Sequence, residues 1–223
     1  MNPLHWLPDR CLACDLPGAP NRRDLCVQCY GELPWCEVVA EPIPGATTVL
    51  AALHYQGGVR DWIHSLKYHN GLVQGRVLGQ LLADAISARY LPRSRRLGLP
   101  DSGYTLPQAL VPVPMPRSRW LRRGRNQAEV LARPLSHLLG IPLRPGLATR
   151  PRKGADQHTR SAIERRDLLA DAFVITSKLP ERIAIVDDVL TTGATCAALT
   201  AALLGAGCRE VHVWCLAVTP APS

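Results

Sequence analysis

Residues 183–195 have the sequence IAIVDDVLTTGAT. Four consecutive apolar residues, 183–186, predict a buried strand of a parallel sheet. This strand carries two adjacent carboxylates, Asp187 and Asp188, at its carboxyl end, and a loop rich in Thr and Gly then leads into a helix. Ligands of open α/β sheets bind at this edge. The segment therefore predicts a ligand site at a junction of strand, loop and helix.

The two halves of this segment favour different parts of one ligand. The loop favours a phosphate, because backbone N–H groups and the positive end of the helix dipole point toward it. Thr191, Thr192 and Thr195 add hydroxyl donors, and Gly193 lets the backbone come close or adopt positive φ. Carboxylates would repel a phosphate but accept hydrogen bonds from vicinal sugar hydroxyls. A sugar that carries a 5-phosphate satisfies both halves.

Other sequence patterns place this segment in a larger α/β fold. Asn126 is the expected N-cap of a helix, with Glu129 completing a capping box, and Pro134 predicts a kink or an early break in that helix. Apolar periodicity indicates helices at residues 59–68, 72–90, 126–139 and 195–204, and strands at 47–55, 109–114, 172–175, 182–188 and 211–218. Alternating strands and helices predict a mostly parallel sheet.

Two pairs of cysteines indicate a metal site near the N-terminus. Cys11 and Cys14 form one Cys-x-x-Cys pair and Cys26 and Cys29 form another, with eleven residues between the pairs. Four thiolates complete a closed, tetrahedral structural zinc site. Such a site contributes on the order of 10 kcal/mol to folding. The alternative is unrelated free thiols, and Cys36 is a spare or replacement ligand. We expect a zinc knuckle over residues 1–40 and an α/β domain over 41–223.

The charge distribution points to a polyanionic partner. The net charge is +8, and six arginines lie between residues 117 and 133, against one acid, Glu129. This suits nucleic acid or a small molecule with several phosphates; the alternative is an ordinary solvated basic surface. Trp120, inside the arginine cluster, is the best candidate to stack on a base. No Gly-Lys dipeptide occurs, which excludes a Walker A loop.

The sequence also predicts where the protein acts. No apolar stretch approaches the roughly 20 residues of a membrane helix. The N-terminus has no basic region followed by an apolar core. We therefore expect a cytoplasmic protein without membrane insertion.

The segment 183–195 resembles the phosphoribosyl-diphosphate signature of type I phosphoribosyltransferases. Over nearly its full length the chain is similar to the ComF/GntX family of competence and DNA-utilisation proteins. Besides the cysteine pairs, the motifs that carry this resemblance are IHSLKY at 63–68, VPVP at 111–114, RGRNQ at 123–127 and VWCL at 213–216. The resemblance implies a type I phosphoribosyltransferase fold, transfer of a phosphoribosyl group from phosphoribosyl diphosphate with Mg²⁺, and a role in DNA uptake or nucleotide metabolism.

The resemblance also implies roles for individual residues. Asp187 and Asp188 correspond to the pair that faces the ribose hydroxyls. The expected 5-phosphate loop is Thr191, Thr192, Gly193, Ala194 and Thr195. The expected pyrophosphate loop includes Val113, Pro114, Met115 and Arg117. The expected flexible loop that closes over the substrate includes Arg150, Lys153 and Gln157. A further family motif, to which no role is assigned, comprises Arg123, Gly124, Asn126 and Gln127.

Two departures from the family pattern bear on the activity. Arg125 stands where an aromatic residue is usual. Thr191 stands where purine salvage enzymes carry an acid that serves as a base, so purine salvage is not expected. Three functions remain open: a phosphoribosyltransferase with an unknown acceptor, a module that handles single-stranded DNA, and a non-catalytic regulator gated by phosphoribosyl diphosphate.

Overall fold

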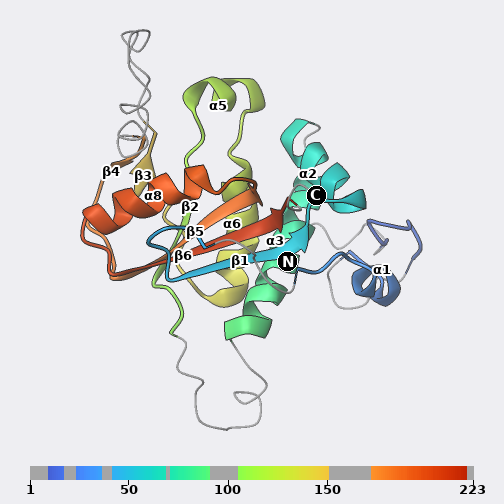
Figure 1. Ribbon diagram of the computed structural model, residues 1–223. Coiled ribbons are helices and arrows are strands. Elements are labelled where there is room, and N and C mark those ends of the chain that lie inside the picture. The colour runs from blue at the N-terminus through green and yellow to red at the C-terminus, as the bar shows by residue number, and fades with distance from the viewer. Residues whose placement is uncertain are drawn as a thin grey trace, which may run out of the picture.

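The computed structural model describes residues 10–17, 24–36, 42–68, 71–90, 105–150 and 172–219. At its centre lies a four-stranded sheet in the order β1-β6-β5-β2, with every neighbouring pair parallel (Figure 1). Its strands are β1 (Thr48–His54), β2 (Ala109–Pro112), β5 (Arg182–Leu190) and β6 (Glu210–Val218). The predicted α/β class with a parallel sheet is confirmed.

Helices cover both faces of the sheet. They are α2 (Gly57–Tyr68), α3 (Leu72–Tyr90), α6 (Gln127–Leu139) and α8 (Ala194–Gly205). Successive residues of β5 point to opposite faces: Ala184 and Val186 lie in one core cluster with α3 and α6, whereas Ile183 and Ile185 lie in a second cluster with α8. Apolar residues on both faces explain the unbroken apolar run of this strand.

The helix α6 runs through Pro134 to Leu139, so the expected early break is wrong. Its packing against α3 compensates for the lost hydrogen bond: a Cβ on Gly79 would lie 2.3 Å from Cγ of Pro134. Asn126 is the N-cap, as predicted, and its side chain accepts from the N–H of Ala128. Glu129 pairs with Arg133.

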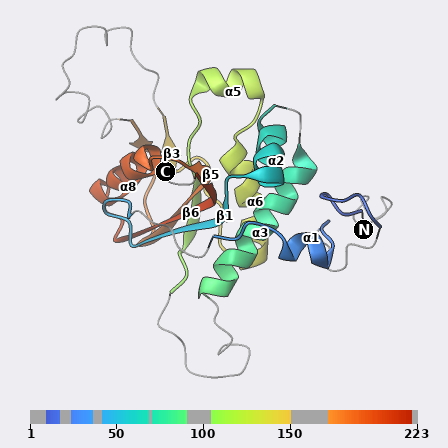
Figure 2. The same ribbon diagram turned by 45° about the vertical axis from the view of Figure 1, so that its right-hand side comes forward.

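Three small elements complete the described structure. These are α1 (Val27–Gly31), α5 (Arg117–Arg123) and an antiparallel pair formed by β3 (Ala148–Thr149) and β4 (Val174–Ile175). The helix α5 escaped sequence prediction because it buries no residue and so shows no apolar period. It stands off from the sheet on two extended segments (Figures 1 and 2).

The cysteine-rich segment is attached to α3 and to the edge of the sheet. Cys11 and Leu25 are buried in the same core cluster as α3. Tyr30 Oη donates to Asp84 Oδ2 of α3 at 3.1 Å, and α1 lies beside α3 (Figure 2). The expected boundary at residue 40 lies outside the described residues, so the division into two domains stays a prediction. None of the described helices is long and apolar enough to cross a membrane.

Candidate functional site

The acid pair lies at the carboxyl edge of the sheet, next to the loop that follows β2. Pro112, the last residue of β2, is paired with Val186 of β5. The N–H of Val113 then donates to the carbonyl of Val186 at 2.9 Å. Because the two strands are parallel, the segment after Pro112 leaves the sheet beside Asp187 and Asp188. The sheet register thus brings together two segments that are 74 residues apart in sequence, since Pro112 pairs with Val186.

A pocket of about 220 Å³ lies at this edge. This volume lies below the roughly 300–1,000 Å³ of pockets for drug-sized ligands. The wall includes both carboxylates and four cationic side chains, which are Lys67, Arg119, Arg123 and Arg150. Of the predicted site residues it also includes Val113, Pro114, Met115, Asn126, Gln127 and Thr195.

Lys67 is a site residue that sequence reasoning did not single out. Its Nζ lies 2.7 Å from Oδ2 of Asp188, and both side chains are mostly shielded from solvent, at 22% and 15% exposure. It comes from the last turn of α2, four residues after the buried Ile63. A lysine beside a buried helical stripe, within the motif 63–68, was the available signal.

The two carboxylates have different environments. Burial is the main cause that raises the pKa of Asp187 to about 8, and the neighbouring Asp188 carboxylate raises it further. Asp187 Oδ1 accepts from the N–H of Asp188 at 2.9 Å, and the thiol of Cys196 lies 4.0 Å from Oδ2. Near neutral pH, Asp187 therefore carries its proton for most of the time, and Asp188 is the carboxylate paired with Lys67.

The loop between β5 and α8 leads into the N-terminus of a helix at the same edge of the sheet. Gly193 is the N-cap of α8 with φ +70°, a conformation that favours glycine. The hydroxyl of Thr192 accepts from the N–H of Ala194 at 3.5 Å, and the side chains of Thr191 and Thr192 are exposed. Of the predicted phosphate loop, Thr195 lines the pocket, whereas residues 191–194 do not. The positive end of the twelve-residue helix α8 thus faces the same edge as the acid pair.

The motif 123–127 holds the wall of the pocket together. Asn126 caps α6 and also donates from Nδ2 to the carbonyl of Val113 at 2.9 Å, which fixes the loop after β2. Arg123 donates to Gln127 Oε1 at 3.1 Å and to Tyr68 Oη at 3.0 Å. Gly124 ends α5 in the left-handed conformation. The motif therefore joins α5, α6 and α2 around the pocket.

Arg119 and Arg150 also line the pocket. Burial, and then the positive charge of Arg119, lower the pKa of Arg150. Arg150 also lies over the ring of Phe173, with Cζ 5.4 Å from the centroid. The two guanidinium groups are therefore close enough to disfavour each other's charge. Arg117 is exposed on α5 and does not line the pocket. Lys153 and Gln157 lie outside the described residues.

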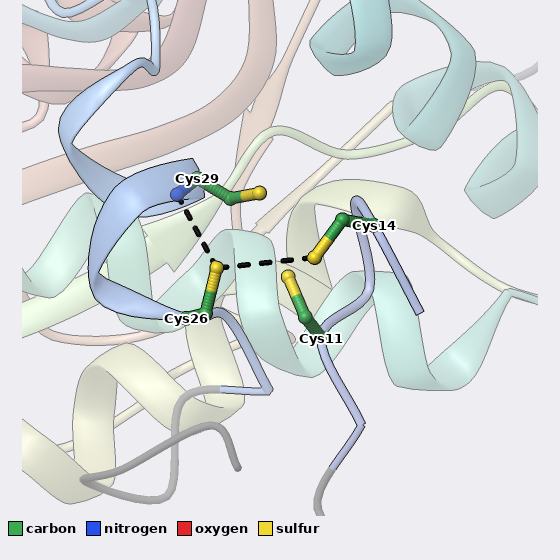
Figure 3. Close-up of side chains that lie close together, drawn as sticks. All are labelled: Cys11, Cys14, Cys26 and Cys29. Atoms are coloured by element: carbon green, nitrogen blue, oxygen red, sulfur yellow. Dashed lines mark hydrogen bonds between the residues drawn. The ribbon is translucent and has the colours of Figure 1, made fainter. Parts of the chain in front are cut away.

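The four predicted cysteine ligands form one cluster (Figure 3). Their sulfur atoms all lie within 4.8 Å of one another, and those of Cys14 and Cys26 are 3.9 Å apart. A Zn–S distance of about 2.3 Å in a tetrahedron separates the sulfurs by about 3.8 Å, so the arrangement could hold a metal such as zinc. The N–H of Cys29 donates to the sulfur of Cys26 at 3.4 Å.

The backbone around Cys11 favours the thiolate of that residue, whereas the neighbouring Cys26 thiol raises the pKa of Cys29. Burial raises the pKa of the Cys11 thiol, but hydrogen bonds from the backbone of Cys26, Cys14 and Ala13 outweigh it and lower the pKa to about 6. The thiolate is the form that binds metal. Among the described residues, this is the one group of three or more His, Cys, Asp or Glu side chains close enough to share an ion.

Comparison with known proteins identifies the family. The DNA utilization protein YhgH of Salmonella typhi is 34% identical, and the match covers 96% of this chain and 92% of that protein. The chain belongs to the YhgH family. Its YhgH relative in Escherichia coli strain K12 is 34% identical over 92% of this chain and 90% of that protein. Competence protein F of Haemophilus influenzae is 32% identical over 86% of this chain and 83% of that protein.

Other comparisons add little about the activity of this YhgH family member. No protein-family model matches the chain. The crystal structure of purine phosphoribosyltransferase from Pyrococcus horikoshii Ot3 is a structural neighbour, with 21% identity, a TM-score of 0.34 and coverage of 62% of this chain and 74% of that one. A likeness at this score does not assign a reaction. The function is therefore inferred from the residues that line the pocket.

Proposed function

We propose that the pocket binds phosphoribosyl diphosphate together with Mg²⁺, and that the protein is a phosphoribosyltransferase that acts in DNA uptake or nucleotide metabolism. The observation that carries this proposal is one pocket that combines an acid pair, Thr195 of the first turn of α8 and four cationic side chains. The names of the relatives, DNA utilization protein and Competence protein F, support the role in DNA uptake. The cytoplasmic location remains a prediction.

The charges of the pocket match this ligand. A phosphate monoester carries about −1.5 to −2 near neutral pH, and phosphoribosyl diphosphate has a monoester at one end of the sugar and a diphosphate at the other. Lys67, Arg119, Arg123 and Arg150 supply four positive charges, against one carboxylate when Asp187 is protonated. Mg²⁺ enters with the phosphates as part of the substrate, because it binds readily to phosphate oxygens.

In this proposal, different residues of the pocket contact different parts of the substrate during pentosyl transfer. Asp188 accepts from the ribose hydroxyls, and the loop 191–195 anchors the 5-phosphate. The bond between C1 of ribose and the diphosphate oxygen breaks, and the acceptor forms its bond to C1. Arg119 and Arg150 stabilise the charge that grows on the departing diphosphate. The alternative is a regulator that binds the same ligand without turnover.

Calorimetry with three ligands tests the pocket. Asp188→Asn weakens the recognition of ribose hydroxyls, and Thr192→Val removes a hydroxyl from the phosphate loop. The loss of a hydrogen bond to a charged group costs roughly 1.5–3 kcal/mol, so each variant should bind phosphoribosyl diphosphate about 10- to 150-fold more weakly. Ribose 5-phosphate should still compete, and free pyrophosphate should compete less well.

The matched control is Asp61→Asn, a change of the same chemistry on an exposed carboxylate of α2 that pairs with Arg60. It should bind like wild type. The proposal fails if wild type shows no heat with phosphoribosyl diphosphate and Mg²⁺, or if both site variants bind as tightly as wild type. Release of pyrophosphate in the presence of candidate acceptors then separates an enzyme from a regulator.

Lys67 offers a second, independent test. Lys67→Met leaves Asp188 without its cationic partner and makes the pocket more negative, so the affinity for phosphoribosyl diphosphate should fall at least about 10-fold. Lys67→Arg keeps the charge and should retain most of the affinity. Lys178→Met, at an exposed position before β5, is the control. Wild-type affinity in Lys67→Met would exclude Lys67 from the binding site.

We also propose that the ion held by the four cysteines is zinc, in a structural role. As partners we propose single-stranded DNA and proteins of DNA uptake, because the relatives are named for DNA use and the chain is strongly basic.

A further inference from the structure

The helix α5 presents two different faces. Arg119 and Arg123, four residues apart, share the face that lines the pocket. Arg117, Trp120 and Leu121 have the spacing i, i+3, i+4 and so share another face, turned away from the first. We call this second set the outer face of α5. The arginines of the inner face belong to the site already described, whereas the outer face has no part in it.

The outer face is exposed to solvent and combines charge with apolar surface. Trp120 is 51% exposed and Leu121 is 67% exposed, and Arg117 beside them is exposed as well. No residue of α5 is buried, and both views show the helix projecting from the rest of the molecule (Figures 1 and 2). Packing within the described structure therefore does not require a tryptophan and a leucine at these positions.

The chemistry of this face selects one kind of partner. An exposed indole stacks on any base, and arginine binds phosphate, so a single strand with unstacked bases satisfies both. A duplex hides the base faces in its stack. A membrane surface is a poorer match, because α5 has seven residues, spans about 10 Å and carries two large apolar side chains.

We propose that the outer face of α5 is a contact site for single-stranded DNA at the mouth of the pocket, a proposal that rests on the role in DNA handling given above. Trp120 stacks on a base, and Arg117 binds an adjacent phosphate. Leu121 covers the edge of the same base. The site is open to a chain of any length, because nothing in the described structure encloses it.

Fluorescence anisotropy with a labelled oligothymidylate of about 20 nucleotides tests the proposal on the full-length protein. Base stacking on an aromatic side chain corresponds to roughly a 5- to 140-fold change in affinity, so Trp120→Ala should weaken binding by a factor in this range. Trp120→Phe keeps a ring and should restore most of the affinity. Arg117→Gln should reduce the slope of log K against log salt by about 0.7, the value for one phosphate.

The controls remove similar groups elsewhere. Leu138→Ala removes an exposed apolar side chain of α6, and Arg209→Gln removes an exposed arginine at the amino edge of the sheet, opposite to the pocket. Both should bind the oligonucleotide like wild type. Equal affinity of Trp120→Ala and wild type would overturn the proposal, and so would an equal loss in Leu138→Ala.

Two further experiments distinguish this site from DNA binding inside the pocket and from binding to a membrane. Saturating phosphoribosyl diphosphate with Mg²⁺ should leave the oligonucleotide bound; complete displacement would place the DNA inside the pocket instead. Vesicles with anionic lipid should not compete with the oligonucleotide at Trp120; if Trp120→Ala loses vesicle binding and keeps DNA binding, the partner is a membrane. The variants are compared without phosphoribosyl diphosphate, so this result does not depend on whether the pocket binds that ligand.

Discussion

Cys29→Ser is expected to release the metal from the cysteine cluster and to unfold the cysteine-rich residues 10–17 and 24–36. The variant removes one of four sulfur ligands that lie within 4.8 Å of one another. A structural zinc site contributes on the order of 10 kcal/mol to folding, and the segment has few buried apolar residues of its own, among them Cys11 and Leu25. Metal analysis of protein purified without chelator should give one zinc per chain for wild type and much less for the variant.

Loss of the metal in Cys29→Ser should also destabilise the core that the cysteine-rich segment shares with α3. Cys11 and Leu25 are part of the core cluster that includes α3, and Tyr30 is bonded to Asp84 of that helix. Limited proteolysis should therefore cut Cys29→Ser within the first 40 residues, and its melting temperature should fall. Cys36→Ser is the matched control, because Cys36 lies outside the cluster of four. Wild-type protein without zinc, or equal metal loss in Cys36→Ser, would contradict the assignment.

Asp187→Asn should make the protein more stable than wild type at alkaline pH. The pKa of Asp187 is about 8 in the folded protein, chiefly because of burial, against about 3.9 in an unfolded chain. Between these two values the folded state binds more protons than the unfolded state. The contribution of Asp187 to folding stability therefore falls as the pH rises from about 4 to 8 and levels off above pH 8. Between pH 5 and pH 9 the ionisation of Asp187 should lower the free energy of unfolding by on the order of 4 kcal/mol.

The amide in Asp187→Asn cannot ionise, so the variant does not lose folding stability through this group as the pH rises. It also keeps the oxygen that accepts from the N–H of Asp188. Denaturant unfolding at pH 5, 7 and 9 should show the difference between Asp187→Asn and wild type growing with pH. The difference between the two proteins is the relevant quantity, because other groups titrate alike in both. Asp61→Asn, at an exposed position, should show no such trend. A difference that stays constant with pH would show that Asp187 is ionised throughout.

Much of the local structure followed from the sequence because it depends on neighbouring residues. The apolar run before Asp187 predicted β5, and apolar periodicity predicted α3 with its bounds at residues 72 and 90. Asn126 predicted the start of α6, since a capping side chain bonds within its own turn. Two Cys-x-x-Cys pairs predicted the cluster, because the spacing alone brings two thiols of each pair together.

The tertiary structure decided which side chains share the pocket. Lys67 reaches Asp188 only because α2 packs beside the carboxyl edge of β5, and no periodicity within either element predicts that distance. Arg119 joined the site through α5, which lacks an apolar stripe and so left no pattern in the sequence. The sequence by itself determined the parallel sheet, through the alternation of strands and helices, and it determined the acid pair and the cysteine cluster through short-range spacing. The high pKa of Asp187 and the cationic side chains that share its pocket depend on burial and on contacts between distant segments, which exist only in the folded chain.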